Sequence, residues 1–203
     1  MKKIFVFLLP LVISAAIGCS NYGSGEITIL YTNDVHGALG YDEASGKVLS
    51  YASVAKMKQD LKQKGKKVLL FDCGDHTSGG VYCSYQSGLP IINIMNRTGY
   101  DAAIFGNHEF DNTFEMVETY ENFATFPYVA TNLYNCTPTG EITTPYTNTS
   151  YTFTLGNIKV GVIGVSTPYT MTTSTPSYFQ DDDGKYIYSF LGDGDGKLLY
   201  EKV

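Results

Sequence analysis

The feature that most constrains this chain is an alternation of short apolar runs and helical segments between residues 27 and 132. Apolar, β-branched runs of this length predict buried strands, which we expect at residues 27–31, 68–71, 102–105 and 129–132. Segments with apolar residues at helical spacing separate them and predict helices at residues 51–64, 89–96 and 114–123. Such alternation is typical of βαβ units, so we predict an α/β fold with a mainly parallel sheet flanked by helices.

The later part of the chain follows another pattern. Residues 151–155 and 159–165 flank Gly156-Asn157, which predicts a hairpin, and beyond Thr167 no period is evident. The chain has 203 residues, of which 43% are hydrophobic, and this length allows one domain with a sizeable core.

Polar clusters follow the first three expected strands. They span residues 32–37, 72–79 and 106–111, and they contain all 3 histidines of the chain. Because the carboxyl ends of parallel strands meet at one edge of a sheet, the clusters should lie together. Taken singly, Asp34 with His36 is better explained as a turn aspartate beside a surface histidine. Their joint placement favours a site, and carboxylate, imidazole and amide oxygen ligands together suit divalent first-row metals.

Three short motifs in these clusters resemble those of the calcineurin-like metallophosphoesterases: Asp34-Val35-His36, Gly74-Asp75 and Gly106-Asn107-His108-Glu109. Within that superfamily, residues 31–37 and 106–111 resemble the 5′-nucleotidase/UDP-sugar hydrolase family. The resemblance runs from about residue 27 to residue 168. It implies an incomplete four-layer (α/β-β/α) sandwich and the amino-terminal portion of such an enzyme.

The resemblance also implies two divalent metal ions, such as Zn or Mn. Asp34 and His36 would bind the first ion, and Asp75 would bridge both. Asn107 would bind the second ion through its amide oxygen. The implied substrate is a small-molecule phosphate ester or nucleotide.

The implied reaction is in-line attack of a metal-activated hydroxide on phosphorus. His108 would be the catalytic imidazole, donating to a phosphate oxygen or to the leaving alkoxide. Asp111 would accept the other ring N–H of His108 and fix its tautomer. His76 matches no ligand of the family, and we expect a loop residue beside Asp75 that could touch substrate.

The first residues predict export. Lys2 and Lys3 precede a short apolar stretch that ends in small residues before Cys19, a pattern that resembles a bacterial lipobox. We expect residues 1–18 to be a cleaved lipoprotein-type signal peptide and Cys19 to be acylated. The protein would then be periplasmic or at the cell surface, anchored to a membrane by its lipid. The alternative is plain signal cleavage nearby, with Cys19 incidental.

After the signal, we expect residues 19–25 to be a tether and residues 26–203 to be the amino-terminal part of a metallophosphoesterase domain. Acylation of Cys19 leaves three cysteines, which allow at most one disulfide whose pairing the spacing does not decide: Cys73, Cys83 and Cys136.

The charge distribution argues against nucleic acid as a partner. The net charge is −6, and most lysines fall between residues 56 and 67, where we expect the wet face of a helix and its exit turn. Nothing in the sequence indicates a protein partner.

The sequence departs from the family pattern at its carboxyl end. The resemblance implies further histidine-bearing motifs and a second, substrate-binding domain, but no histidine follows His108. We therefore expect a truncated domain and weigh two hypotheses. One is a hydrolase by descent; the other is a catalytically inactive surface lipoprotein that at most binds metal or nucleotide.

Overall fold

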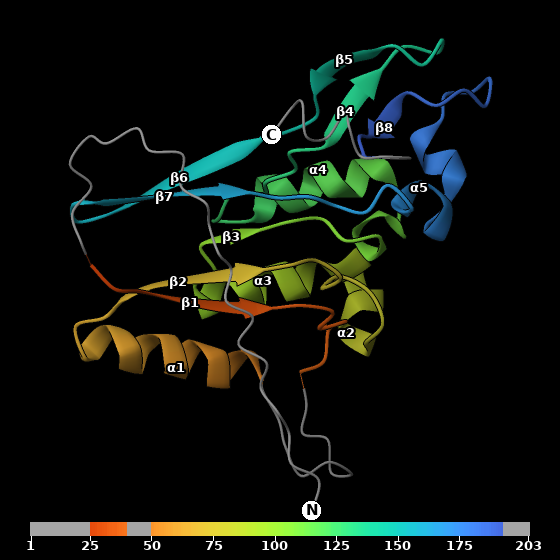
Figure 1. The fold of residues 1–203 in the computed structure, drawn as a ribbon. Helices are drawn as coiled ribbons and strands as arrows, with labels where there is room; N and C mark the ends of the chain where they lie inside the picture. The colour runs from red at the N-terminus through yellow and green to blue at the C-terminus, as the bar shows by residue number, and fades with distance from the viewer. Residues whose placement is uncertain (1–24, 40–49, 193–203) are drawn as a thin grey trace, which may run out of the picture.

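The computed structural model describes residues 25–39 and 50–192 of the chain. A parallel sheet of three strands lies at its centre, in the order β1 (Ile27–Thr32), β2 (Lys67–Asp72) and β3 (Ala102–Ala103) (Figure 1). The predicted α/β fold with a parallel sheet flanked by helices is confirmed.

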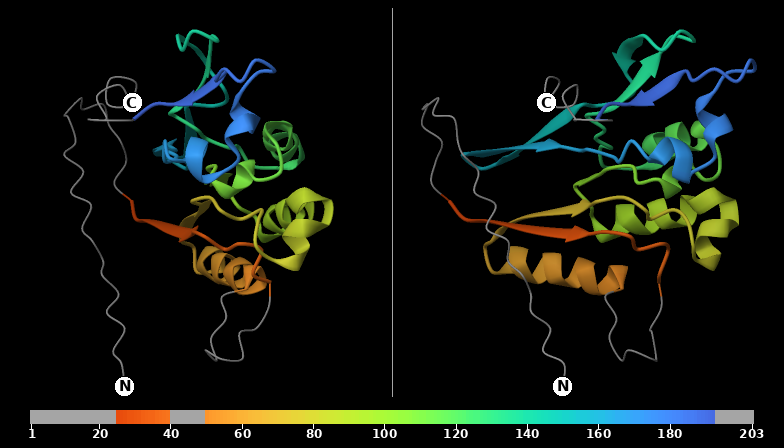
Figure 2. Two further views of the ribbon diagram at one scale, coloured as in Figure 1. Left: turned by 90° about the vertical axis from the view of Figure 1, so that its right-hand side faces the viewer. Right: turned by 45° about the vertical axis from the view of Figure 1, so that its right-hand side comes forward.

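Three helices connect and cover these strands. They are α1 (Tyr51–Gln63), α3 (Leu89–Thr98) and α4 (Phe114–Phe123), and all lie on one side of the strands (Figure 2). All three were predicted, and local signals set their ends. The α1 helix begins after Ser50, whose hydroxyl accepts a hydrogen bond from the Ser53 N–H at 3.2 Å. The α3 helix ends at Gly99, which adopts a left-handed conformation with φ +81°.

The buried face of α1 differs from the expected one. Lys58 was predicted to lie on the wet face, but it is only 5% exposed. Its ammonium lies 2.6 Å from the Asp101 carboxylate, just before β3, so the buried charge is paired. Met57, one of the apolar residues whose helical spacing predicted this helix, is 46% exposed. The buried face of α1 therefore includes Lys58, whose charge is paired, and not Met57.

The prediction of a fourth strand at residues 129–132 was wrong. Tyr128 forms only an isolated parallel bridge with Ala103, and the next strand, β4 (Leu133–Cys136), belongs to another sheet. That sheet is antiparallel, and β4 lies between β5 (Ile142–Pro145) and β8 (Tyr188–Phe190).

The predicted hairpin is confirmed as β6 (Ser150–Leu155) and β7 (Ile158–Ile163), which pair antiparallel around Gly156. Short helical turns complete the described chain: α2 (Val81–Ser84), η1 (Tyr85–Gly88), η2 (His108–Phe110), α5 (Thr170–Thr173) and η3 (Pro176–Phe179).

Aromatic side chains dominate the core between the helices and the sheets. Phe110 is fully buried, with its ring centroid 5.8 Å from that of Phe105, 5.5 Å from Phe114 and 5.2 Å from Phe179. This packing joins the end of the parallel sheet to the segments that follow it.

β1 is the outer strand of the parallel sheet within the described residues. Its Ile29 and Tyr31 side chains, which point to the same face of the sheet, are 53% and 71% exposed. The cysteines that the structure describes, Cys73, Cys83 and Cys136, are free thiols, whereas Cys19 lies outside the described residues. No helix of the described part is long and apolar enough to cross a membrane.

Candidate metal centre

Side chains from three strand ends converge at the carboxyl edge of the parallel sheet. One ligand atom each of His36, Asp75 and His108 lies within 4.8 Å of the others. The rings of His36 and His108 meet edge to face, with centroids 4.9 Å apart. Two imidazoles and a carboxylate at this spacing form a donor set that suits Zn or Mn ions.

Two glycines allow the loops after β2 and β3 to approach this closely. A side chain on Gly106 would place its Cβ 2.2 Å from Oδ1 of Asp75, and one on Gly74 would meet the Gly106 nitrogen at 2.4 Å. Gly74 also has φ +93°, a conformation that other residues rarely adopt. The loop sequences therefore bring Asp75 against the residues that follow β3.

The loop after β1 is joined to the loop after β2 by main-chain hydrogen bonds. The Asp34 N–H donates to the Gly74 carbonyl at 3.1 Å, and the His36 N–H donates to the Asp75 carbonyl at 2.9 Å. Asp34, His36 and Asp75 all have positive φ, at 52°, 49° and 59°. Strained backbone of this kind clusters at functional sites.

The remaining sequence-predicted residues border the cluster. Oδ1 of Asp34 lies 3.9 Å from Nε2 of His36, and Asn107 immediately precedes η2, which carries His108. Oδ2 of Asp111 lies 2.6 Å from Nδ1 of His108. Asp34, His36, Asp75, His108 and Asp111 therefore lie close to one another, and Asn107 precedes His108 in the chain.

The electrostatic surroundings favour a protonated His108. Partial burial lowers its pKa, but the hydrogen bond with Asp111 and the charges of Asp111 and Asp75 raise the pKa above its ordinary value. Since Asp111 occupies Nδ1, the Nε2 atom is the one left to face a ligand.

A buried polar layer beneath the site was missed at the level of sequence. His76 is fully buried, with Nδ1 2.7 Å from Oδ1 of Asp72 and Nε2 2.8 Å from the Tyr128 hydroxyl. Burial alone would lower the pKa of His76, but the charges of Glu109 and Asp72 raise it to about 9. His76 therefore supports the fold and cannot touch substrate.

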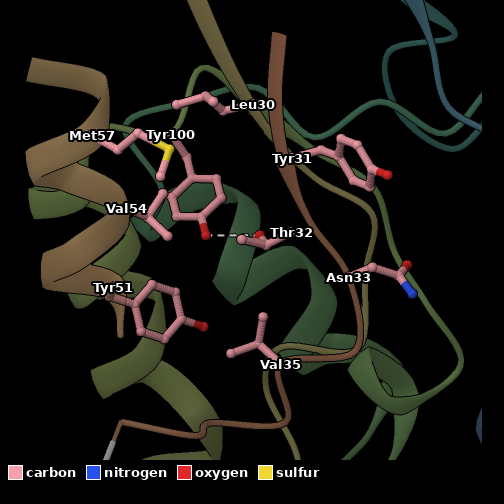
Figure 3. Close-up of a pocket in the computed structure, with 9 residues that line it drawn as sticks. All are labelled: Leu30, Tyr31, Thr32, Asn33, Val35, Tyr51, Val54, Met57 and Tyr100. Carbon is pink, nitrogen blue, oxygen red and sulfur yellow. Dashed lines mark hydrogen bonds between the residues drawn. The ribbon is translucent and has the colours of Figure 1, made fainter. Parts of the chain in front are cut away.

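A pocket of about 360 Å³ lies close by, on the side of the sheet that α1 covers (Figure 3). Tyr51 and Val54 line it from α1, and Thr32 lines it from β1, with its hydroxyl 2.8 Å from that of Tyr100. None of His36, Asp75 and His108 lines this pocket.

Comparisons with known proteins agree with this geometry. The family model described as calcineurin-like phosphoesterase matches residues 27–197. Protein UshA of Salmonella pullorum is 35% identical over 158 residues, which cover 77% of this chain and 28% of that protein. The 5′-nucleotidase of Vibrio cholerae serotype O1 is 31% identical over 186 residues, covering 84% and 33% of the two chains.

A solved structure supports the same fold. The 5′-nucleotidase precursor from Thermus thermophilus matches with a TM-score of 0.66 at 26% identity, covering 86% of this chain and 34% of that one. The chain thus spans about a third or less of the length of these relatives.

Proposed function

The chain belongs to the calcineurin-like phosphoesterase family, and on this premise we propose that it hydrolyses nucleotides or related phosphate esters with divalent metal ions. The observation that carries the proposal is the convergence of His36, Asp75 and His108 from three successive strand ends. The names of the relatives, two of which are 5′-nucleotidases, support the nucleotide class of substrate.

The residues divide into ligands and a proton donor in this proposal. Asp34, His36, Asp75 and Asn107 would hold the ions, with Asp75 shared between them as the family resemblance implies. Bound ions would activate water and neutralise charge on the phosphate.

His108 would supply the proton. Its Nε2 is free because Asp111 accepts from Nδ1, and its raised pKa keeps the ring protonated closer to neutrality. A proton at Nε2 can then pass to the leaving oxygen as negative charge builds there. Asp111 keeps the ring in the orientation and tautomer that this transfer needs.

One experiment separates the ligand and donor roles. We expect the chain to bind Mn²⁺ in calorimetry and to release inorganic phosphate from a nucleoside 5′-monophosphate only when Mn²⁺ is present. His108→Ala should keep most of the Mn²⁺ affinity and lose phosphate release, whereas Asp75→Asn should lose both. Asp182→Asn, in an exposed turn, is the matched control and should change neither.

Other outcomes would overturn parts of the proposal. Phosphate release that persists in both variants would remove its basis. Mn²⁺ binding without any release would favour the alternative of a protein that binds metal or nucleotide without turnover.

We further propose export and lipid anchoring through Cys19, on the strength of the signal-like residues 1–18. Metabolic labelling with a radioactive fatty acid should mark the parent chain and not Cys19→Ala. Equal labelling of both would exclude this anchor.

A further inference from the structure

Glu109 is a buried carboxylate directly beside the candidate metal centre, and neither the sequence motifs nor the proposed mechanism gives it a task. Its side chain is fully buried. It therefore cannot reach substrate, and its charge must be compensated inside the protein, because an unpaired buried carboxylate is strongly unfavourable.

The compensation comes from five hydrogen bonds and from the His76 ring, whose Nδ1 lies 3.6 Å from Oε1 of Glu109. Oε2 accepts from the N–H groups of Asp75 at 2.8 Å and Gly106 at 2.7 Å. Oε1 accepts from the N–H groups of His76 at 2.8 Å and Thr77 at 3.0 Å, and from the Thr77 hydroxyl at 3.1 Å. Both oxygens are thus saturated, which leaves none to serve as a metal ligand.

These donors belong to the two loops that carry the site. Residues 75–77 follow β2, and Gly106 follows β3, so one carboxylate ties both loops to the same point. Hydrogen bonds from N–H groups to a carboxylate are about twice as strong as those to a neutral acceptor. They hold the main chain at Asp75, where φ is +59° and an unsupported loop would relax.

The main chain that Glu109 holds in turn positions the side chains of Asp75 and His108. Oδ1 of Asp75 accepts from the His108 N–H at 3.0 Å, so the carboxylate of Asp75 is fixed against the residue beside Glu109. We propose that Glu109 is a positioning residue that holds Asp75 and His108 at their spacing before any ion binds. This inference rests on the proposed metal-dependent function.

Glu109→Gln tests the proposal, because the amide keeps one acceptor oxygen and turns an NH₂ group toward N–H donors. We expect its affinity for Mn²⁺, measured by calorimetry on the folded chain, to fall about 10- to 100-fold. Glu121→Gln is the matched control: Glu121 is a half-buried carboxylate on α4 that accepts from the Thr147 hydroxyl, and its loss should leave the Mn²⁺ affinity unchanged.

A purely structural role would lower the unfolding free energy of Glu109→Gln without changing the affinity of its folded fraction. An affinity within twofold of the parent would therefore overturn the proposal. The parent chain gives a second measurement should the variant fail to fold. Without metal, the amide protons of Asp75, His76 and Thr77 should be among the slowest to exchange, and fast exchange would overturn the proposal.

Failure of this inference is distinguishable from failure of the proposed function. A parent that binds Mn²⁺ but releases no phosphate contradicts the hydrolase and leaves the affinity comparison decisive for Glu109. A parent that binds no Mn²⁺ overturns both.

Discussion

The loops that carry Asp75 and His108 share a buried carboxylate, whereas the turn that carries Asp34 and His36 is held by main-chain hydrogen bonds to one of those loops. We call residues 74–77 and 106–111 the anchored loops and residues 33–37 the surface turn. The difference does not lie in exposure, since the side chains of His36 and His108 are both 37% exposed. The two regions differ instead in the hydrogen bonds that hold the main chain of each.

The anchored loops share the saturated carboxylate of Glu109 and the aromatic core below it. The surface turn has main-chain hydrogen bonds to Gly74 and Asp75, and two of its residues carry strained positive φ. The anchored loops thus fix the positions of Asp75 and His108, and the surface turn is positioned by its hydrogen bonds to them. Substitutions in the anchored loops should therefore affect both stability and ligand binding, whereas substitutions in the surface turn should affect ligand binding alone.

The largest effect is expected for Phe110→Ala, which removes a fully buried ring that packs the anchored loops against the core. The cavity should lower the unfolding free energy by about 3–5 kcal/mol. Urea unfolding measures this, with Phe123→Ala as the matched control on an exposed side of α4 (47% exposed), expected within about 0.5 kcal/mol of the parent. A loss below about 1 kcal/mol in Phe110→Ala would show that the anchored loops do not depend on this core.

Tyr128→Phe should have the next largest effect. The change removes the hydroxyl 2.8 Å from Nε2 of His76 and keeps the ring stacked on Phe105 at 4.4 Å. An unpaired buried group costs about 1–3 kcal/mol. Tyr31→Phe, at a hydroxyl on a 71% exposed side chain, should stay within about 0.5 kcal/mol. Equal unfolding midpoints for the two variants would contradict a role for the buried polar layer.

A substitution in the surface turn should weaken Mn²⁺ binding and change the unfolding free energy little. His36→Gly removes a proposed ligand, so Mn²⁺ binding should fall sharply, but glycine adopts φ +49° without strain. The unfolding free energy should stay within about 1 kcal/mol of the parent. His36→Ala keeps the strained Cβ and should be less stable than His36→Gly by about 0.5–1 kcal/mol. The reverse order, measured by urea unfolding, would show that the turn is not strained.

Much of this architecture was predictable from sequence, because its signals are local. The helix at residues 114–123 and the hairpin around Gly156 follow from apolar spacing, caps and turn residues, and the structure places them as expected. The strand expected at residues 129–132 failed because an apolar run alone does not say whether a neighbouring strand is long enough to pair, and β3 has only two residues.

The buried polar layer was not predictable in the same way. Asp72 ends β2, in which Val68, Leu69 and Leu70 are all buried, so no alternation in the sequence marked it as a buried charge. Its partner His76 follows in the next loop, but Glu109 joins that loop from more than 30 residues away. Contacts between residues so far apart in sequence depend on tertiary structure. A motif shows which residues are present, but it does not show their hydrogen-bond partners.

The smallest effect is expected for Glu121, a carboxylate whose surroundings differ from those of Glu109. Glu121 is partly buried, and burial raises its pKa above 4.5 although the Thr147 hydroxyl donates to it, whereas Glu109 has five donors. A raised folded-state pKa means that the folded chain binds the proton more tightly than the unfolded chain. The contribution of Glu121 to stability is therefore full below pH 4.5 and lost as the pH rises through its raised pKa. Urea unfolding across this range should show a downward slope that Glu121→Gln reduces; an unchanged slope would mean that one hydroxyl suffices to offset the burial of a carboxylate here.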